Sequence, residues 1–313
     1  MISLSRVCEQ LKSGNDYLIL MHASPDGDTI GSATALCLAL QKMGKRVKCR
    51  CADTIDSKYL YMFNDIKTQD FEEKCVISVD VADTKLLGKL KEEYEDRIDI
   101  NIDHHISNKM FAKVNYVVGE SGANCENIYD IIKGLNAEID GNIANCLYTG
   151  ISTDTGCFKY SNTTARTFRI AADLLDLGAD TAYINRILFE TKSKARIEVE
   201  KQALENMEFH CHDKVALILI TDKMQEKATL SDLEGITAMP RTVEDVLIGI
   251  TLKHKGENLY KVSVRTFEPI DASAICSNFG GGGHSAAAGC EMHGSLDEVK
   301  LRLLEVCKKE LEK

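Results

Sequence analysis

Apolar and polar residues alternate along Ile98–Asp103, where Ile98, Ile100 and Ile102 fall on one face. A period of two predicts a β-strand. Short apolar runs predict further strands at Tyr17–Met21, Val47–Cys51, Cys75–Val79 and Ala112–Val117, the last at a sheet edge, and helices are expected at Ile30–Leu40, Cys125–Lys133, Asn142–Thr153 and after the N-cap cluster Ser161–Thr164. Strands that alternate with helices predict an α/β fold with a mainly parallel sheet covered on both faces.

The pattern changes in the last third of the chain. Residues 191–210 are charged and read as an exposed connector helix, with Ile197, Leu204 and Met207 on one stripe. Strands are predicted at Val215–Ile220, Val246–His254 and Tyr260–Arg265, and a closing helix at Leu296–Leu311. We therefore expect a catalytic domain over residues 1–190, the connector over 191–210, and a smaller mixed α/β domain over 211–313.

Carboxylates and imidazoles follow the predicted strands of the first domain where each strand ends. They are His22, Asp26 and Asp28 after the first strand, Asp80 after the third, Asp103, His104 and His105 at the fourth, and Asp154 at the end of a helix. Taken singly, each is equally well explained as a cap or a turn residue. The carboxyl ends of parallel strands share one edge, where ligands bind in open α/β sheets.

Several carboxylates at one edge repel each other unless cations neutralise them. Carboxylates mixed with imidazoles suit manganese, iron or cobalt, whereas an all-oxygen site suits magnesium or calcium. We expect two manganese ions in one active site, with Mg²⁺ or Co²⁺ as substitutes. Two neighbouring ions can stabilise the attacking and leaving oxygens of a phosphoryl transfer.

The charge and residue composition of the chain limit which molecules we expect it to bind. The 313-residue chain has a net charge of −10, which argues against tracking long DNA or RNA but leaves short nucleotides possible. Its twelve cysteines show no disulfide or zinc spacing, so we expect reduced thiols and a cytoplasmic protein. No apolar run is long enough to cross a bilayer, so no membrane is expected.

A run of glycines, Gly280–Gly283, precedes His284 in the second domain. Read alone, it is a flexible turn. It also suits a backbone that approaches a phosphate closely near a helix start. Arg265, at the end of a predicted strand, can grip a phosphate with two parallel hydrogen bonds, although a lone arginine is more often a surface residue.

In order along the chain, His22-x-x-Pro25-Asp26-Gly27-Asp28, Asp80, Asp103-His104-His105, Asp154 and the late glycine–histidine run closely resemble the DHH phosphoesterase family. The resemblance covers nearly the whole chain, including a DHH-associated C-terminal domain. Within the family the chain is most similar to the stand-alone NrnA-like oligoribonucleases, which also remove the 3′-phosphate of 3′-phosphoadenosine 5′-phosphate (pAp).

The resemblance implies a role for each motif. His22, Asp26 and Asp80 would hold one metal, and Asp28, Asp80, His104 and Asp154 the other, with Asp80 as the bridge. Asp103 would orient an imidazole, and His105 would face the scissile phosphate or its leaving group. The substrate would be held by Arg265, Gly281, Gly282, Gly283 and His284, which we expect to form one wall of a cleft between the domains.

The leading hypothesis is a manganese-dependent phosphodiesterase that releases nucleoside monophosphates from di- to pentanucleotides and dephosphorylates pAp. The alternative substrates are dinucleotide second messengers such as pApA, pGpG or c-di-AMP. Inorganic pyrophosphatases differ in the C-terminal half, and long-strand exonucleases carry additional domains. A nucleotide-sensing or metal-buffering module would be expected to have an altered ligand set. The sequence leaves monomer and homodimer both open.

Overall fold

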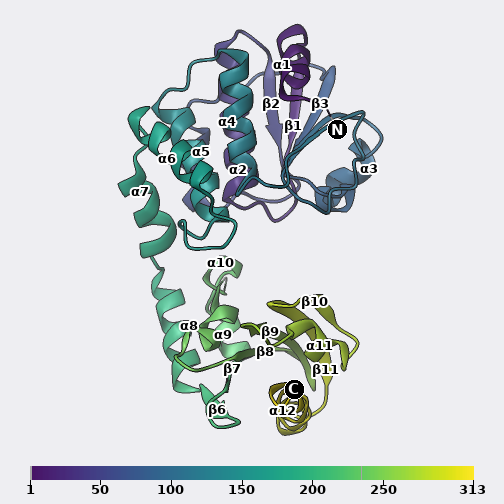
Figure 1. The fold of residues 1–313 in the computed structure, drawn as a ribbon, viewed down its shortest axis with the longest axis vertical. Helices are drawn as coiled ribbons and strands as arrows, with labels where there is room; N and C mark the ends of the chain where they lie inside the picture. The colour runs from purple at the N-terminus through teal and green to yellow at the C-terminus, as the bar shows by residue number, and fades with distance from the viewer. Residues whose placement is uncertain (1, 234) are drawn as a thin grey trace. The chain divides into compact units, whose positions relative to one another are not determined.

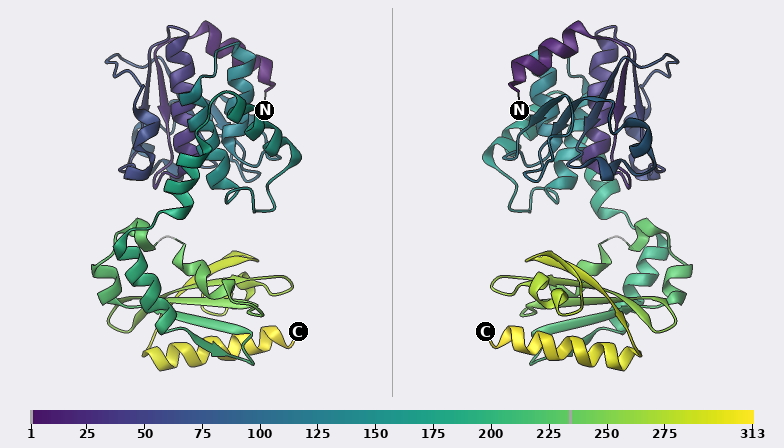
Figure 2. Two further views of the ribbon diagram at one scale, coloured as in Figure 1. Left: turned by 90° about the vertical axis from the view of Figure 1, so that its left-hand side faces the viewer. Right: turned by 90° about the vertical axis from the view of Figure 1, so that its right-hand side faces the viewer.

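The computed structural model describes residues 2–233 and 235–313. The chain divides into two compact units, with the boundary after Thr191 (Figures 1 and 2). Each unit has its own hydrophobic core. None of the helices within the described residues combines the length and the apolar character that crossing a bilayer needs.

The first unit is built on a five-stranded sheet in which every strand runs parallel to its neighbours. Its strands are β1 (Tyr17–Leu20), β2 (Val47–Arg50), β3 (Cys75–Val79), β4 (Ile98–Asp103) and β5 (Val114–Val117), in the order β2-β1-β3-β4-β5. The predicted α/β fold is thus confirmed, with β5 at an edge. All five carboxyl ends point to one side of the sheet.

Side chains of β1 alternate between two cores. Tyr17 and Ile19 pack with the helices on one face, and Leu18 and Leu20 pack on the other. The first face carries α1 (Leu4–Ser13), α2 (Gly27–Lys42), η1 (Ser57–Phe63), α4 (Asn124–Leu135) and α5 (Gly141–Asp154), and the second carries η2 (Thr84–Leu90) and α3 (Lys91–Tyr94). The sheet is therefore covered on both faces.

Helix α2 begins at Gly27, earlier than the apolar run predicts, because Asp26 is its N-cap. The carboxylate of Asp26 accepts hydrogen bonds from the backbone N–H groups of Asp28 and Thr29. A Cβ atom at Gly27 would lie 2.4 Å from Oγ1 of Thr153 in α5. Glycine at this position lets the ends of α2 and α5 approach each other, and both ends carry candidate metal ligands.

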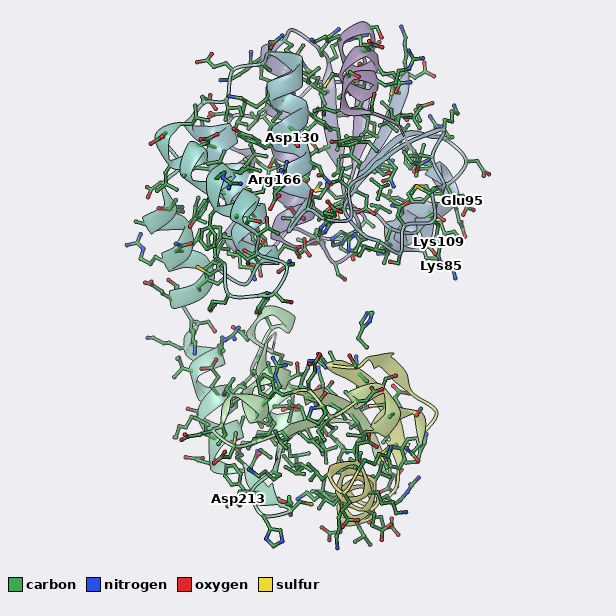
Figure 3. All side chains as sticks on the ribbon, viewed as in Figure 1. Lys85, Glu95, Lys109, Asp130, Arg166 and Asp213 are labelled. Carbon is green, nitrogen blue, oxygen red and sulfur yellow. The ribbon has the colours of Figure 1, made fainter. Side chains whose placement is uncertain are left out.

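Further helices complete the first unit: α6 (Ala165–Asp176), α7 (Thr181–Asn185) and η3 (Arg186–Glu190). Helix α6 starts at the predicted cap cluster, where Thr164 and Thr167 form a reciprocal capping box. Its Arg166 donates to Asp130 of α4 at 2.5 Å (Figure 3). This ion pair joins two helices of the same layer.

The second unit contains a mixed six-stranded sheet in the order β10-β11-β9-β8-β7-β6. The strands are β6 (Glu208–His210), β7 (Val215–Ile220), β8 (Ile248–Gly256), β9 (Leu259–Thr266), β10 (Gly282–His284) and β11 (Ala287–His293), of which β7 and β8 are parallel. One face packs on α11 (Ala272–Ser277) and α12 (Leu296–Leu311), and the other packs on α8 (Lys194–Glu205), α9 (Asp222–Glu226) and η4 (Ile236–Thr242). A short helix α10 (Leu230–Leu233) also lies in this unit.

The structure differs from the prediction for residues 191–210. Helix α8 buries Val199 and Ala203 against the sheet, so it is not an exposed connector on every side, although Ile197 and Leu204 are 52% and 59% exposed as expected; Met207, the third residue of the predicted stripe, packs against the same core. The predicted helix also stops at Glu205, and Glu208–His210 adds a strand to the sheet. Residues 194–210 thus belong to the second unit, because the buried side of α8 packs against the apolar face of the second sheet.

The glycine run does not lie near a helix start. It follows the C-terminal end of α11 and enters the hairpin β10–β11. A Cβ atom at Gly281 would lie 2.2 Å from the carbonyl oxygen of Gly289, and one at Gly283 would lie 2.6 Å from that of Ala287. These two glycines are needed because the strands pack too closely for a side chain.

Candidate functional site

The structure brings all eight predicted residues of the first unit to the carboxyl edge of its sheet. His22 follows β1, Asp80 follows β3, and Asp103 ends β4 with His104 and His105 directly after it. The turn into α2 supplies Asp26 and Asp28, and the last turn of α5 supplies Asp154.

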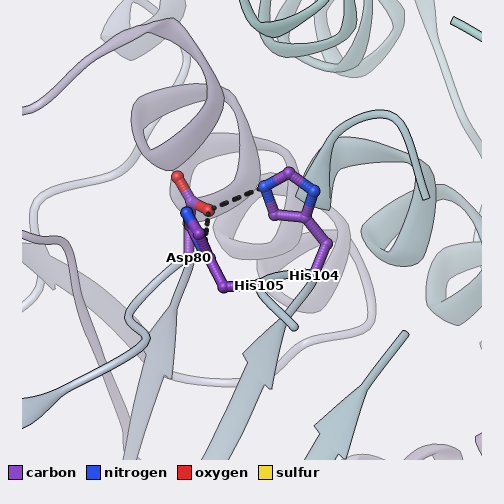
Figure 4. A group of neighbouring side chains, drawn as sticks. All are labelled: Asp80, His104 and His105. Atoms are coloured by element: carbon purple, nitrogen blue, oxygen red, sulfur yellow. Dashed lines mark ion pairs between the residues drawn. The ribbon is translucent and has the colours of Figure 1, made fainter. Parts of the chain in front are cut away.

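Asp80 lies at the centre of this cluster. Its Oδ1 is 3.5 Å from Nε2 of His104 and 3.6 Å from Nδ1 of His105 (Figure 4), and its Oδ2 is 3.6 Å from Nε2 of His22. These distances are too long for good hydrogen bonds. Oδ1 is buried and has no hydrogen-bond donor. The backbone of Asp80 has a φ of 59°, a strained conformation that is typical of functional sites.

Backbone carbonyls set the orientation of two imidazoles. Nδ1 of His22 donates to the carbonyl of Ala23 at 2.8 Å, and Nδ1 of His104 donates to that of Ser121 at 3.1 Å. A carbonyl oxygen only accepts hydrogen bonds, so the proton is on Nδ1 in both rings. Each Nε2 is therefore free to face the carboxylates, in the arrangement expected for metal-ligating histidines.

Asp28 is held by the start of a neighbouring helix. Its two carboxylate oxygens accept hydrogen bonds from the backbone N–H groups of Asn124 (2.6 Å) and Cys125 (2.9 Å), the first two residues of α4. These free N–H groups and the helix dipole favour a negative charge there. Nε2 of His104 lies 3.8 Å from Oδ2 of Asp28 and 3.7 Å from Oδ2 of Asp154.

His22 and His104 are positively charged at neutral pH in the metal-free protein. Burial lowers the pKa of His22, but the carboxylates of Asp26 and Asp80 outweigh burial and raise it to about 11. Burial likewise opposes the rise at His104, where Asp80 and Asp28 bring the pKa to about 10. Protons thus balance part of the negative charge.

The carboxylates respond to burial and to each other. Burial, with Asp80 and Asp154 nearby, raises the pKa of Asp28 well above its usual range. Burial is also the main reason that the pKa of Asp154 rises to about 6, although His104 opposes it. Burial acts in the same direction on Asp80, but His104 and His22 outweigh it and hold the pKa of Asp80 well below its usual range.

Asp103 fixes the orientation of the His105 ring from the protein interior. It is fully buried, and its Oδ1 accepts a 2.8 Å hydrogen bond from Nδ1 of His105, while its Oδ2 accepts one from the amide of Asn108. The hydrogen bond to Asp103 raises the pKa of His105 above its ordinary value. Because Nδ1 is occupied, Nε2 is the nitrogen of His105 that is free to contact a substrate.

The donor set fits a divalent cation. Three groups of side chains each place one ligand atom apiece within 4.8 Å of the others: His22, Asp26 and Asp80; Asp28, His104 and Asp154; and Asp80, His104 and His105. Two ligands at about 2.1 Å from one ion lie roughly 3–4 Å apart, so the separations in the cluster suit a bound ion. The buried Oδ1 of Asp80 lacks a donor, and a cation would satisfy it.

In the second unit three of the predicted substrate residues also come together. Arg265 in β9 lies opposite Ala287 in β11, which lies opposite His284 in β10. Directly opposed residues of antiparallel strands project from the same face. Arg265 and His284 therefore share one face, with only an alanine between them, and Gly282 is on the next row of that face.

Several residues that hydrogen-bond to the site residues could not be predicted from the sequence. Asn108 lies in an irregular loop, and no periodic pattern connects it to Asp103. Asn127 donates to the backbone carbonyl of Asp103 from the interior of α4, through a contact that is distant in sequence. The role of Asn124 and Cys125 did have a signal, because a helix was expected to begin there and helix starts leave N–H groups free.

Comparisons with known proteins agree with this geometry. Residues 16–151 match the model of the DHH family, N-terminal domain, and residues 213–313 match the DHHA1 domain. The bifunctional oligoribonuclease and PAP phosphatase NrnA of Thermus thermophilus is 33% identical over 97% of this chain and 93% of its own length. The probable bifunctional oligoribonuclease and PAP phosphatase NrnA of Streptococcus mutans is 26% identical over 94% of each chain.

A crystal structure of an exopolyphosphatase-related protein from Bacteroides fragilis has a similar fold across both units. It is 25% identical, with a TM-score of 0.87, and the match covers 99% of this chain and 97% of that one. The motifs at the strand ends, the two matched domains and the full-length relatives lead to the same result. This chain belongs to the DHH phosphoesterase family, with a DHHA1 domain as its second unit.

Proposed function

We propose that this protein is a two-metal phosphodiesterase that releases nucleoside monophosphates from di- to pentanucleotides and removes the 3′-phosphate of pAp. The observation that carries the proposal is the position of Asp80, whose two oxygens face different imidazoles and whose Oδ1 is buried without a donor. A carboxylate shared in this way suits two adjacent cations. The names of the full-length relatives supply the substrate class.

In the proposed site His22, Asp26 and Asp80 hold one ion, and Asp28, Asp80, His104 and Asp154 hold the other. Manganese is our first choice, because the ligands combine carboxylate oxygen with imidazole nitrogen. Two bound ions would supply the positive charge that stabilises the attacking and leaving oxygens of a phosphodiester in hydrolysis.

His105 acts on the leaving group in this proposal. Its hydrogen bond to Asp103 fixes the ring and keeps a larger protonated fraction at neutral pH. The proton on Nε2 passes to the leaving oxygen as its bond to phosphorus breaks, and solvent then restores the proton. Asp103 orients the ring and stabilises its charge.

A single set of incubations tests this function. The protein with manganese is given pAp, a linear dinucleotide, a cyclic dinucleotide and pyrophosphate, and products are read by chromatography and phosphate release. We expect phosphate from pAp and nucleoside monophosphates from the linear dinucleotide. Turnover of pyrophosphate alone, or of the cyclic dinucleotide alone, would overturn the proposal. The Asp80→Asn variant, prepared in parallel, controls for contaminating nucleases.

A further inference from the structure

The face of the second sheet that carries Arg265 is covered only in part. Over β7 and β8 it is buried by α8, α9 and η4, where Val199, Met224 and Ile236 pack on Ile218 and Ile220. Over β9, β11 and β10 the same face is half-buried or exposed among the described residues. This open part of the sheet borders the part that α8, α9 and η4 cover, and it carries charged and small residues instead of large apolar ones.

Strand register arranges this face of the sheet in rows, whose β9, β10 and β11 members are open, whereas Gly249 and Thr251 of β8 are buried. In order along β9, the three rows are Lys253–Lys261–Glu291, Thr251–Ser263–Gly289–Gly282 and Gly249–Arg265–Ala287–His284. The middle row is made of small residues. The two lysines therefore lie at one end of this face and Arg265 lies at the other. The row of small residues between them forms a flat floor without a large side chain.

The Lys253–Lys261 pair is unusual for a sheet. Like charges directly opposite each other destabilise paired strands. No salt bridge to either ammonium group occurs within the described residues, although Glu291 lies across from Lys261. Burial, together with Lys255 and Lys261, lowers the pKa of Lys253. A bound anion would relieve this repulsion.

A cavity of about 460 Å³ lies beside Lys261. Its lining includes Lys261, Gly282, Gly289 and Glu291, together with the segment Phe279–Gly281. A Cβ atom at Gly282 would meet nothing within 4 Å, so the floor is open there. The volume is in the range of small-ligand sites and can take a sugar or a base.

Spacing along β9 indicates which phosphate would reach the lysines. Arg265 and Lys261 are four residues apart, which at about 3.3 Å per residue is roughly 13 Å. Neighbouring phosphates of an oligonucleotide are joined through a single sugar and cannot span that length. A phosphate two linkages away can, and its chain would lie across the small-residue floor.

We propose that Lys253 and Lys261 form a second phosphate subsite, which holds the phosphate two linkages from the one bound at Arg265. This inference rests on the proposed function and deepens it. The subsite selects substrates by length: 5′-phosphorylated trinucleotides and longer oligonucleotides engage the lysine pair, whereas pAp and dinucleotides end before it.

The test compares Lys261→Gln with the wild-type protein on pAp, a 5′-phosphorylated dinucleotide and a 5′-phosphorylated tetranucleotide. Loss of one phosphate contact should raise KM for the tetranucleotide about fivefold and reduce the slope of log KM against log salt by about 0.7. KM for pAp and the dinucleotide should stay within about twofold, since neither reaches this row. Lys253→Gln should give the same pattern.

Lys308→Gln is the matched control, because it removes one exposed positive charge from α12, which packs on the opposite face of the same sheet. Equal losses on all three substrates, an unchanged tetranucleotide KM, or the same effect from Lys308→Gln would each overturn the subsite. Anisotropy of a labelled tetranucleotide, measured with chelator present, tests binding without turnover. A wild-type protein that cleaves none of the substrates contradicts the proposed function instead, and the anisotropy comparison still decides the subsite.

Discussion

His105 donates the hydrogen on Nδ1 to Oδ1 of Asp103 at 2.8 Å, and the two residues differ sharply in exposure. The side chain of Asp103 is fully buried, whereas 43% of the His105 side chain is exposed. The pair therefore connects the protein interior to the surface of the site. The buried carboxylate keeps Nδ1 occupied and leaves Nε2 available for the contact with substrate that we propose.

Asp103→Asn keeps the shape of this pair but removes its charge. We expect activity to fall by roughly 10–100-fold, with partial rescue by added manganese. Because Asp103 raises the pKa of His105, the variant should also lose its protonated, active histidine at a lower pH than the wild type. The measurement is kcat against pH. A loss that equals that of Asp80→Asn and resists added metal would place Asp103 among the metal ligands.

Metal binding should release protons. His22 and His104 have pKa values of about 11 and 10 without metal, so both are protonated at pH 7 and must become neutral to bind an ion. A pKa raised in the metal-free protein means that metal affinity increases with pH up to that pKa. Calorimetry in two buffers of different ionisation enthalpy, at pH 7.0 and 8.5, measures the protons released. Identical heats in the two buffers would contradict the protonated state.

Two neighbouring glycines should respond differently to the same substitution. At Gly283 φ is 149° and a Cβ atom would lie 2.6 Å from the carbonyl oxygen of Ala287, so Gly283→Ala should lower the melting temperature by several degrees. At Gly282 a Cβ atom meets nothing within 4 Å, so Gly282→Ala should fold normally and affect only KM. Differential scanning calorimetry distinguishes them, and equal melting temperatures would argue against the close packing of β10 on β11.

Arg265→Ala tests whether the second unit holds the substrate. KM for a dinucleotide or pAp should rise, and kcat can fall as well, because binding energy away from the reacting phosphate helps to position it. Hydrolysis of bis(p-nitrophenyl) phosphate should barely change, since this compound has no second phosphate or nucleoside for Arg265 to hold. Equal losses on the natural and the artificial substrate would show that Arg265 acts in the chemical step or in folding.

Much of the fold follows from local pattern. The isoleucines of β4 alternate as a strand requires, and each parallel strand delivers its polar residues to the same edge, so the gathering of Asp80, Asp103 and His104 could be predicted without coordinates. The family resemblance read from these motifs is confirmed by the domain matches and the full-length relatives.

The remaining features depend on contacts that are distant in sequence. Helix α8 has apolar residues on more than one face, and only the sheet beneath it determines that Val199 is buried and Ile197 is not. The glycine run was expected near a helix start, but the close approach of β10 to β11 requires two of its members. Likewise, nothing local indicates that Asn108 would contact Asp103.

The most direct test of the account is the metal content and turnover of Asp80→Asn. Because the two oxygens of Asp80 face His22 and His104, which belong to different proposed ion sites, its replacement should weaken the binding of both ions and reduce hydrolysis of a dinucleotide by several orders of magnitude, with the fold retained at neutral pH. Equilibrium dialysis with manganese, read by elemental analysis, should give two ions for the wild type and fewer than one for the variant. Near wild-type turnover by the variant, or two tightly bound ions, would contradict a shared carboxylate at the centre of the site.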